Sequence, residues 1–301
     1  MSFTANPRRG YILGLAAYCT WGMFPLYFKS LEGIPAIEVV VHRVLWSALF
    51  GALLLMIWRH PGWFRELLAH PKRLLALTAS GALIAVNWLT YVWAVHNDYM
   101  VEASLGYYIN PLINVLIGTL FLGETLSRAQ WAAVALAAVG VAILAAGALT
   151  TLWISVVLAI SFAVYGVVRR TLPVGSLPGL TVEALVLTPP ALGAILFIAS
   201  GPAGVALGQD GPVDFAVSLS GLITAIPLLM FAIAARRMDY STLGFVQFIA
   251  PTTVFILGLT VFHEPLHPAQ LWSFIFIWIA IAVFAWDLLK RHRQLKAATS
   301  V

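Results

Sequence analysis

Long apolar runs, each ended by charged residues, proline or glycine, follow one another along the whole chain. A run of about 20 apolar residues is long enough to cross the hydrocarbon core of a bilayer as a helix. Ten such segments can be recognised, at 11–29, 35–58, 74–96, 101–121, 129–149, 150–168, 180–200, 215–236, 242–262 and 268–288. The runs are continuously apolar, whereas the strands of a membrane barrel would alternate. The pattern therefore predicts an all-α integral membrane protein with ten transmembrane helices.

The second half of the chain resembles the first. Residues 101–131 align without gaps on residues 241–271, an offset of 140. Seven of the 31 aligned positions are identical, among them Pro111/Pro251 and Glu124/Glu264. Two further matches are Trp21-Gly22 with Tyr165-Gly166 and Glu38 with Glu183. The sequence therefore predicts an internal duplication.

Each expected repeat, 1–149 and 150–301, holds five of the ten segments. Because five is an odd number, the second repeat enters the membrane from the opposite side and the two repeats are inverted. Inverted repeats around a site at the middle of the membrane are typical of carriers that work by alternating access. We therefore expect a transporter with a central cavity between the two halves.

Composition and charge support a membrane location. Hydrophobic residues make up 61% of the chain and charged residues 10%, against about 25% charged in a soluble domain. If the N-terminus is cytoplasmic, 15 of the 17 basic residues fall on the cytoplasmic side. By the positive-inside rule we expect both termini in the cytoplasm. The net charge of +5 then reflects topology and does not indicate a nucleic-acid partner.

Several kinds of chemistry find no support in the sequence. Cys19 is the only cysteine, which excludes an intramolecular disulfide and a thiolate metal site. The chain has no Walker A sequence, no His-Glu-x-x-His and no Gly-x-Ser-x-Gly, and no pair of intramembrane aspartates. We therefore expect no enzyme activity, no metal and no cofactor.

Arg43 is the basic residue that lies within an expected span. An arginine there costs about 2.5–3.5 kcal/mol on insertion scales unless it is paired or hydrated. Two interpretations stay open: a structural pair with Glu38 or Glu102, or a contact with the substrate. Glu38, His42 and Glu102 lie with Arg43 toward the outer end, whereas Glu183 and Arg236-Arg237 lie toward the inner end.

These two groups of charges are candidates for an outer and an inner gate. Protonation of Glu38, Glu102 or Glu183 would offer a route to proton coupling. The alternative is that these acids are hydrated residues of the two mouths, with no role in coupling.

Segment 101–121 carries a polar stripe. Tyr107, Asn110 and Asn114 share one helical face, and Pro111 among them frees a backbone carbonyl. We expect Pro111 and its copy Pro251 to break their helices beside a cavity, although a polar packing seam is the alternative. Further cavity candidates, chosen because they are polar or aromatic and lie deep in other spans, are Tyr18, Trp21, Asn87, Tyr91, Tyr165 and Gln247.

Five ordered motifs carry a resemblance to a known family. They are HRVLWS (42–47), NWLTYVWAV (87–95), EASLGYYINP (102–111), FLGE (121–124) and STLGFVQFIAPT (241–252). These segments resemble those of RarD-type permeases, in the EamA family of the drug/metabolite transporter superfamily. The resemblance runs from Gly10 to Asp287. It implies a bacterial ten-helix carrier of the cytoplasmic membrane, with the fifth and tenth helices at its periphery.

The resemblance also implies export of amino acids, drugs or related metabolites. The function expected here is therefore a secondary transporter for a small amphipathic molecule. Three alternatives stay open: an exchanger of anionic metabolites of the same superfamily, a membrane receptor or assembly protein without transport, and a membrane-embedded enzyme. Whether the fifth and tenth helices mediate a homodimer is also open.

Overall fold

The computed structural model describes residues 7–31, 33–57, 62–97, 99–146, 152–202, 204–208, 211–263 and 268–299. Every regular element in these ranges is an α-helix, which confirms the predicted all-α fold. The helices are α1 (Pro7–Gly22), α2 (Phe24–Lys29), α3 (Ala36–Ile57), α4 (Trp63–Leu68), α5 (Pro71–His96), α6 (Met100–Leu120), α7 (Arg128–Ala145), α8 (Leu152–Thr171), α9 (Ser176–Ala199), α10 (Gly211–Ala234), α11 (Tyr240–Gln247), α12 (Ile249–Thr260) and α13 (Pro268–Thr299).

The helices provide the ten expected membrane crossings. Within the described ranges, nine spans are long and apolar enough to cross a bilayer, and α6 adds a shorter apolar stretch, Leu105–Leu120. The first crossing combines α1 and α2, and the ninth combines α11 and α12. The predicted segments therefore correspond to the observed helices in number and order.

The two prolines expected to break helices differ in their effect. α6 stays helical through Pro111, so the predicted break there is wrong. Proline removes one backbone hydrogen bond, and the remaining bonds of the 21-residue helix keep it intact. Near Pro251 the helix is interrupted, because the carbonyl of Gln247 finds no N–H four residues later. A turn at Phe248 separates α11 from α12.

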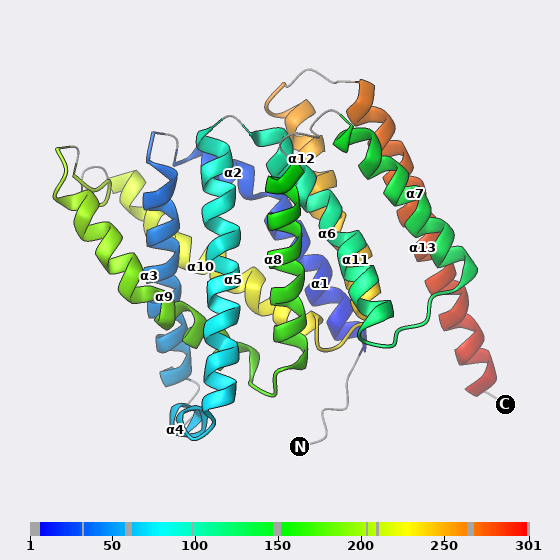
Figure 1. Ribbon diagram of the computed structural model, residues 1–301, viewed down its shortest axis with the longest axis horizontal. Coiled ribbons are helices and arrows are strands. Elements are labelled where there is room, and N and C mark those ends of the chain that lie inside the picture. Colours follow the sequence, from blue (N-terminus) through cyan, green and yellow to red (C-terminus); the bar gives the residue numbers. More distant parts are fainter. Residues whose placement is uncertain are drawn as a thin grey trace.

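Helices of the two halves pack in matching pairs (Figure 1). α5 packs on α8 as α10 packs on α1, and α6 packs on α8 as α11 and α12 pack on α1. Likewise, α3 packs on α10 as α5 packs on α9. Each of these contacts turns into its partner when the first five crossings are exchanged for the last five.

Glycines at corresponding positions permit two of these contacts. A Cβ on Gly221 of α10 would overlap the backbone of Trp46 in α3. At an offset of 140, a Cβ on Gly81 of α5 would lie 3.4 Å from the carbonyl oxygen of Glu183 in α9. The α3–α10 approach is therefore closer than the α5–α9 approach, and only the first requires glycine.

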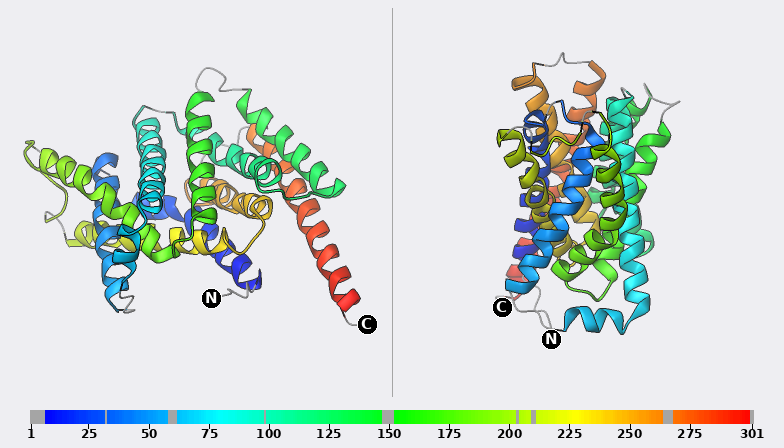
Figure 2. Two further views of the ribbon diagram at one scale, coloured as in Figure 1. Left: turned by 60° about the horizontal axis from the view of Figure 1, so that its bottom comes forward. Right: turned by 90° about the vertical axis from the view of Figure 1, so that its left-hand side faces the viewer.

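The remaining helices lie around this bundle. α7 and α13 pack chiefly on each other at one edge of the molecule, where the resemblance places the fifth and tenth helices. The start of α1 and the end of α13 lie at the same face, which is the lower one in Figure 1. The short helix α4 lies across that face, as the right-hand view of Figure 2 shows.

Candidate functional site

A small cavity lies between α3, α5, α8, α9 and α10. Its empty volume, counted with the space that opens from it, is about 310 Å³. The lining residues are Val44, Ser47, Ile84, Trp88, Tyr165, Leu180, Glu183, Ala184, Leu187, Thr224 and Leu228. Most of these side chains are apolar and a few are polar, which is the usual make-up of a small-molecule site.

Eight of the 11 lining residues form four pairs separated by 140 positions. The pairs are Val44/Ala184, Ser47/Leu187, Ile84/Thr224 and Trp88/Leu228. The helices that carry them, α3 and α9, also begin 140 residues apart, at Ala36 and Ser176. The cavity therefore lies where corresponding positions of the two halves meet.

The same offset corrects the expected match between Glu38 and Glu183. At 140 residues, Glu183 corresponds to Arg43, and both are the eighth residue of their helices. Glu38 corresponds to Pro178. The earlier match rested on residue type alone, whereas the helix starts fix the register. Opposite charges thus occupy equivalent positions in the two halves.

Arg43 lies among aromatic rings beside the cavity. Its Nε donates a hydrogen bond of 2.8 Å to Oγ1 of Thr224. Its guanidinium carbon is 4.6 Å from the centre of the Trp88 ring, 5.9 Å from that of Phe24 and 5.8 Å from that of Phe28. Among the described side chains, no carboxylate lies within ion-pair distance of Arg43, so the structural pair with Glu38 is not formed.

Two tyrosines extend this aromatic environment. Tyr91 and Tyr107 pack edge to face with ring centres 5.9 Å apart, and both lie close enough to Arg43 to interact with its charge. Tyr107 keeps 37% of its surface exposed although it lies in the eighth position of a 21-residue helix. The space beside Arg43 is thus more open than the interior around it.

We expect a cysteine at position 107 to be accessible from water. In a Cys19→Ala background, Tyr107→Cys should react with a membrane-impermeant thiol reagent, because its side chain lies beside the guanidinium of Arg43. Asn110→Cys, one turn further along α6 where the side chain is 1% exposed, should stay unreactive. The measurement is the labelling rate in whole cells.

Leu116 provides the control on the same helix. It is 47% exposed, and as an apolar residue of a membrane span it should face lipid, where a thiol does not ionise and reacts slowly. Equal labelling of Tyr107→Cys and Leu116→Cys would show that Tyr107 faces lipid as well, and would remove the opening beside Arg43.

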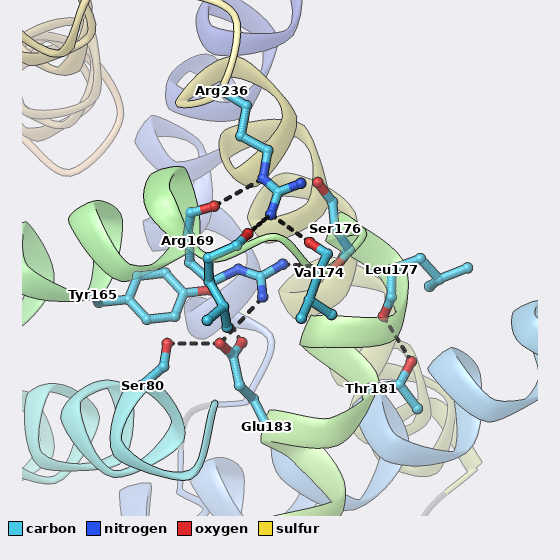
Figure 3. Close-up of polar contacts among 10 residues, drawn as sticks. Ser80, Tyr165, Arg169, Val174, Ser176, Leu177, Thr181, Glu183 and Arg236 are labelled. Atoms are coloured by element: carbon cyan, nitrogen blue, oxygen red, sulfur yellow. Dashed lines mark hydrogen bonds and ion pairs between the residues drawn. The ribbon is translucent and has the colours of Figure 1, made fainter. Parts of the chain in front are cut away.

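Glu183 is held in a buried polar cluster (Figure 3). Oε1 accepts a hydrogen bond of 2.7 Å from Ser80 of α5 and lies 3.5 Å from Nη1 of Arg169 in α8. Tyr165 donates to Oε2 at 3.5 Å. Arg169 is fully buried, and its Nη2 also donates to the carbonyl of Ser176 at 2.8 Å. The expected inner-side partners of Glu183 were Arg236 and Arg237, whereas the structure provides Arg169.

Arg236 instead ties the segment between α8 and α9 to the end of α10. Its Nε donates to the carbonyl of Arg169 at 2.9 Å, and its Nη2 donates to the carbonyls of Leu172 and Val174 (Figure 3). Partial burial lowers the pKa of Arg236, and the charge of Arg169 acts in the same direction. The two arginines are therefore held side by side by hydrogen bonds that outweigh their repulsion.

Gly179 makes room for the guanidinium of Arg169. A Cβ on Gly179 would overlap Nη1 of Arg169, which cannot move freely because it is buried and bonded on both sides. We expect Gly179→Ala to lower the free energy of unfolding by about 1–3 kcal/mol, as overpacking usually does. Thermal unfolding of the purified protein would measure it.

The matched control for this change is Gly193→Ala in the same helix. A Cβ on Gly193 meets nothing within 4 Å, so the change should be neutral or stabilising by up to about 1 kcal/mol through helix propensity. If Gly179→Ala behaved like Gly193→Ala, the tight seat of Arg169 would be wrong.

The predicted amides bond to protein groups. Asn87 donates to the carbonyl of Leu158 at 2.8 Å and to Ser161, and Asn110 donates to the carbonyl of Ala159 at 2.6 Å. Asn114 donates to Asn110 and to Gln247, whose Oε1 also accepts from Tyr18. All four amides are buried, and these bonds join α5, α6, α8, α11 and α1. They have the arrangement of a packing seam next to the cavity.

An aromatic cluster connects this seam to the cavity. Tyr18 and Trp21 pack edge to face at 5.2 Å, and both contact Phe231. Phe231 stacks in turn on Tyr165, which lines the cavity, at 6.1 Å. Of the predicted cavity residues, Tyr165 and Glu183 thus line it directly, and Arg43 and Trp21 lie one side chain away.

Near the start of α3, Glu38 makes local contacts. It accepts a hydrogen bond of 2.5 Å from the backbone N–H of Ala206 and lies 3.7 Å from Nε2 of His42. Both side chains are buried, so they are not hydrated residues of an open mouth. The side chain of Glu102, the other outer candidate, lies outside the described side chains.

Glu124 has a structural role that the repeat alone did not reveal. It accepts hydrogen bonds from the backbone N–H groups of Tyr240 and Ser241, at 2.5 and 2.8 Å, and so caps the start of α11. It also lies 3.4 Å from Arg170. Partial burial raises the pKa of the neighbouring Asp239, and the charge of Glu124 adds to this effect. Its copy, Glu264, lies outside the described residues.

The described residues contain no group of three or more His, Cys, Asp or Glu side chains that could hold a metal ion. The polar groups around the cavity are instead an acid, an arginine, hydroxyls and amides. Such groups bind and orient an organic solute through hydrogen bonds and charge.

Known proteins agree with this arrangement. The model of the EamA-like transporter family matches residues 8–146. The transporter PA0485 of Pseudomonas aeruginosa is 53% identical, over 97% of this chain and 98% of its own length. The chain belongs to the EamA-like transporter family.

Other members of the EamA-like family are similar over their whole length. Protein RarD of Streptomyces exfoliatus is 43% identical, over 96% of this chain and 92% of its own, and the transporter YojE of Bacillus subtilis is 39% identical, over 97% and 99%. One solved crystal structure, 20% identical, superposes with a TM-score of 0.71 over 94% of this chain and 98% of its own. That likeness supports the fold alone.

Proposed function

We propose that this protein is a secondary transporter that exports small amphipathic molecules, such as amino acids or drug-like compounds, by alternating access. The observation that carries the proposal is the cavity lined by four residue pairs at an offset of 140. A site shared by two related halves can be exposed to either side when the halves exchange their arrangements. Relatives named as transporters support the class.

The proposal includes inverted repeats and a cytoplasmic location of both termini. The matching helix contacts and the shared offset support the repeats. Both chain ends lie at one face, and so do the ends of α8 and α10 with their arginine pairs. Positive charge concentrated at that face supports its placement in the cytoplasm, and thus a location in the bacterial cytoplasmic membrane.

The two ends of the cavity differ in this conformation. Near Arg43, tyrosine side chains remain partly exposed, whereas near Glu183 the acid, Arg169 and Tyr165 are all buried. In the proposed orientation the protein is therefore closed toward the cytoplasm by the Glu183–Arg169 cluster. Opening of this cluster would admit a solute from the cytoplasm.

An exchanger of anionic metabolites is less well supported. A doubly charged phosphate ester would call for several free cations in the membrane interior. Of the two arginines near the cavity, Arg169 is already bonded to Glu183. Arg43 alone could then meet an anion, which suits a singly charged group better.

Counterflow in proteoliposomes tests the proposal. Vesicles preloaded with one unlabelled amino acid or amphenicol should accumulate the same labelled compound transiently, because a carrier exchanges solute faster than it equilibrates net flux. A receptor, an assembly protein or an enzyme would show no saturable counterflow with any member of the panel. Repeating the assay after collapse of the proton gradient tests proton coupling separately.

A further inference from the structure

Arg43 has hydrogen-bonding capacity beyond its contact with Thr224. A guanidinium carries five N–H donors in a planar fork, and only Nε has a hydrogen-bond acceptor among the described residues. The side chain is half-buried and not fully enclosed. The two Nη groups can therefore bond to a solute that enters from the cavity side.

The surroundings of Arg43 select the kind of group that it can bind. The ring of Trp88 covers the guanidinium at 4.6 Å and also lines the cavity, so a solute body in the cavity lies against the indole. Rings of this kind hold a guanidinium in a fixed orientation and exclude water from its faces. The open edge of the fork then matches a planar carboxylate, which it can bind through two parallel hydrogen bonds.

Tyrosine hydroxyls add further donors. Tyr91 and Tyr107 lie within range of the charge of Arg43, and no hydrogen bond of either hydroxyl is found among the described residues. A phenol can donate to the same anion that accepts from the guanidinium. Opposite this region, the cavity is walled by aliphatic side chains such as Leu180 and Leu187.

We propose that Arg43, with Trp88 and Tyr107 beside it, binds the carboxylate of the transported solute. The site then takes singly charged carboxylates with an apolar or aromatic body, and a neutral amide of the same shape binds less well. This inference rests on the proposed transport function, since it names the solute class of the same cavity.

The test compares phenylacetate with phenylacetamide, which have almost the same shape and differ in charge. Binding of each compound to the purified wild-type protein in nanodiscs would be measured by calorimetry and by the shift in unfolding temperature. We expect phenylacetate to bind at least tenfold more tightly. Equal affinity for the two compounds, or no binding of phenylacetate, would overturn the proposal without the need for any variant.

Variants locate the preference. Arg43→Gln should abolish the acid-over-amide ratio, and Arg43→Lys should restore it only in part, because an ammonium lacks the planar fork. Lys29→Gln is the matched control, since Lys29 also lies over an aromatic ring, that of Phe262 at 5.2 Å, but at the end of its span. A preference that survives in Arg43→Gln would assign the carboxylate to another residue. If Arg43→Gln does not fold, the ratio measured with Arg43→Lys decides.

Flux measurements keep the two proposals apart. Selective binding without counterflow of phenylacetate or any other panel member would leave the carboxylate site in place and remove the transport function. Counterflow without preference for the acid would do the reverse.

Discussion

Replacement of Arg169 by methionine is expected to lower the free energy of unfolding by about 3–5 kcal/mol, since it leaves Glu183 as a buried carboxylate without its cation. Both side chains are at most 2% exposed, and the closest nitrogen–oxygen distance is 3.5 Å. Ser80 and Tyr165 would still donate to Glu183 but carry no charge. Unfolding of the purified protein in detergent would measure the loss.

A second change should recover most of this loss. In Arg169→Met/Glu183→Gln no buried charge remains, and the amide oxygen can still accept from Ser80. The coupling between the two positions is then the non-additive part of a double-mutant cycle. Arg291→Met is the control: its ion pair with Asp287, at 3.0 Å, is on a side chain 45% exposed, and should contribute less than about 1 kcal/mol. Additive losses at Arg169 and Glu183 would contradict the pairing.

Neutralisation of Glu183 is expected to shift the protein toward the inward-open arrangement. Glu183→Gln weakens the contacts that join α9 to α5 and α8 in the closed cluster, whereas an open arrangement would hydrate Arg169. State-dependent contacts of this kind are worth about 1–3 kcal/mol, which corresponds to a 5- to 150-fold change in the ratio of the two states.

Labelling from each side of the membrane measures the shift. Ala184→Cys, which lines the cavity and is 7% exposed, would serve as the reporter in a Cys19→Ala background. Its reactivity from the cytoplasmic side of inverted vesicles should rise when Glu183 is replaced by Gln. Asp214→Asn is the control, because Asp214 accepts from the N–H of Gly208 in a surface loop away from the cavity. An unchanged ratio of inside to outside labelling would remove Glu183 as a gate.

The fold class could be predicted from the sequence because a bilayer acts on each segment separately. A run of apolar residues crosses the membrane as a helix whatever its neighbours are, so ten crossings follow from the positions of charges, prolines and glycines. The same reasoning predicted the outer placement of α7 and α13 only through family resemblance, since both are as apolar as the central helices. Pro111 shows a limit of local reasoning, because packing keeps α6 continuous across it.

The site could be predicted only in part. Arg43 and Glu183 stood out because a charge within a span is costly, and both lie at the cavity. Their partners could not be found in this way. Arg169 appeared to be one of many cytoplasmic positive charges, and Thr224 and Ser80 carried no distinguishing pattern. The helix starts at Ala36 and Ser176 also replaced the Glu38 match by Arg43.

The sequence by itself thus determined the membrane spans, the internal duplication and the costly intramembrane charges, since these depend on composition and local spacing. The tertiary structure decided which helices meet, and with them the bonding of Glu183 to Arg169 and of Arg43 to Thr224. Residues 14 and 181 positions apart form these contacts. No local pattern encodes such a distance in space, because it is fixed only when small residues such as Gly179 and Gly221 allow their helices to approach.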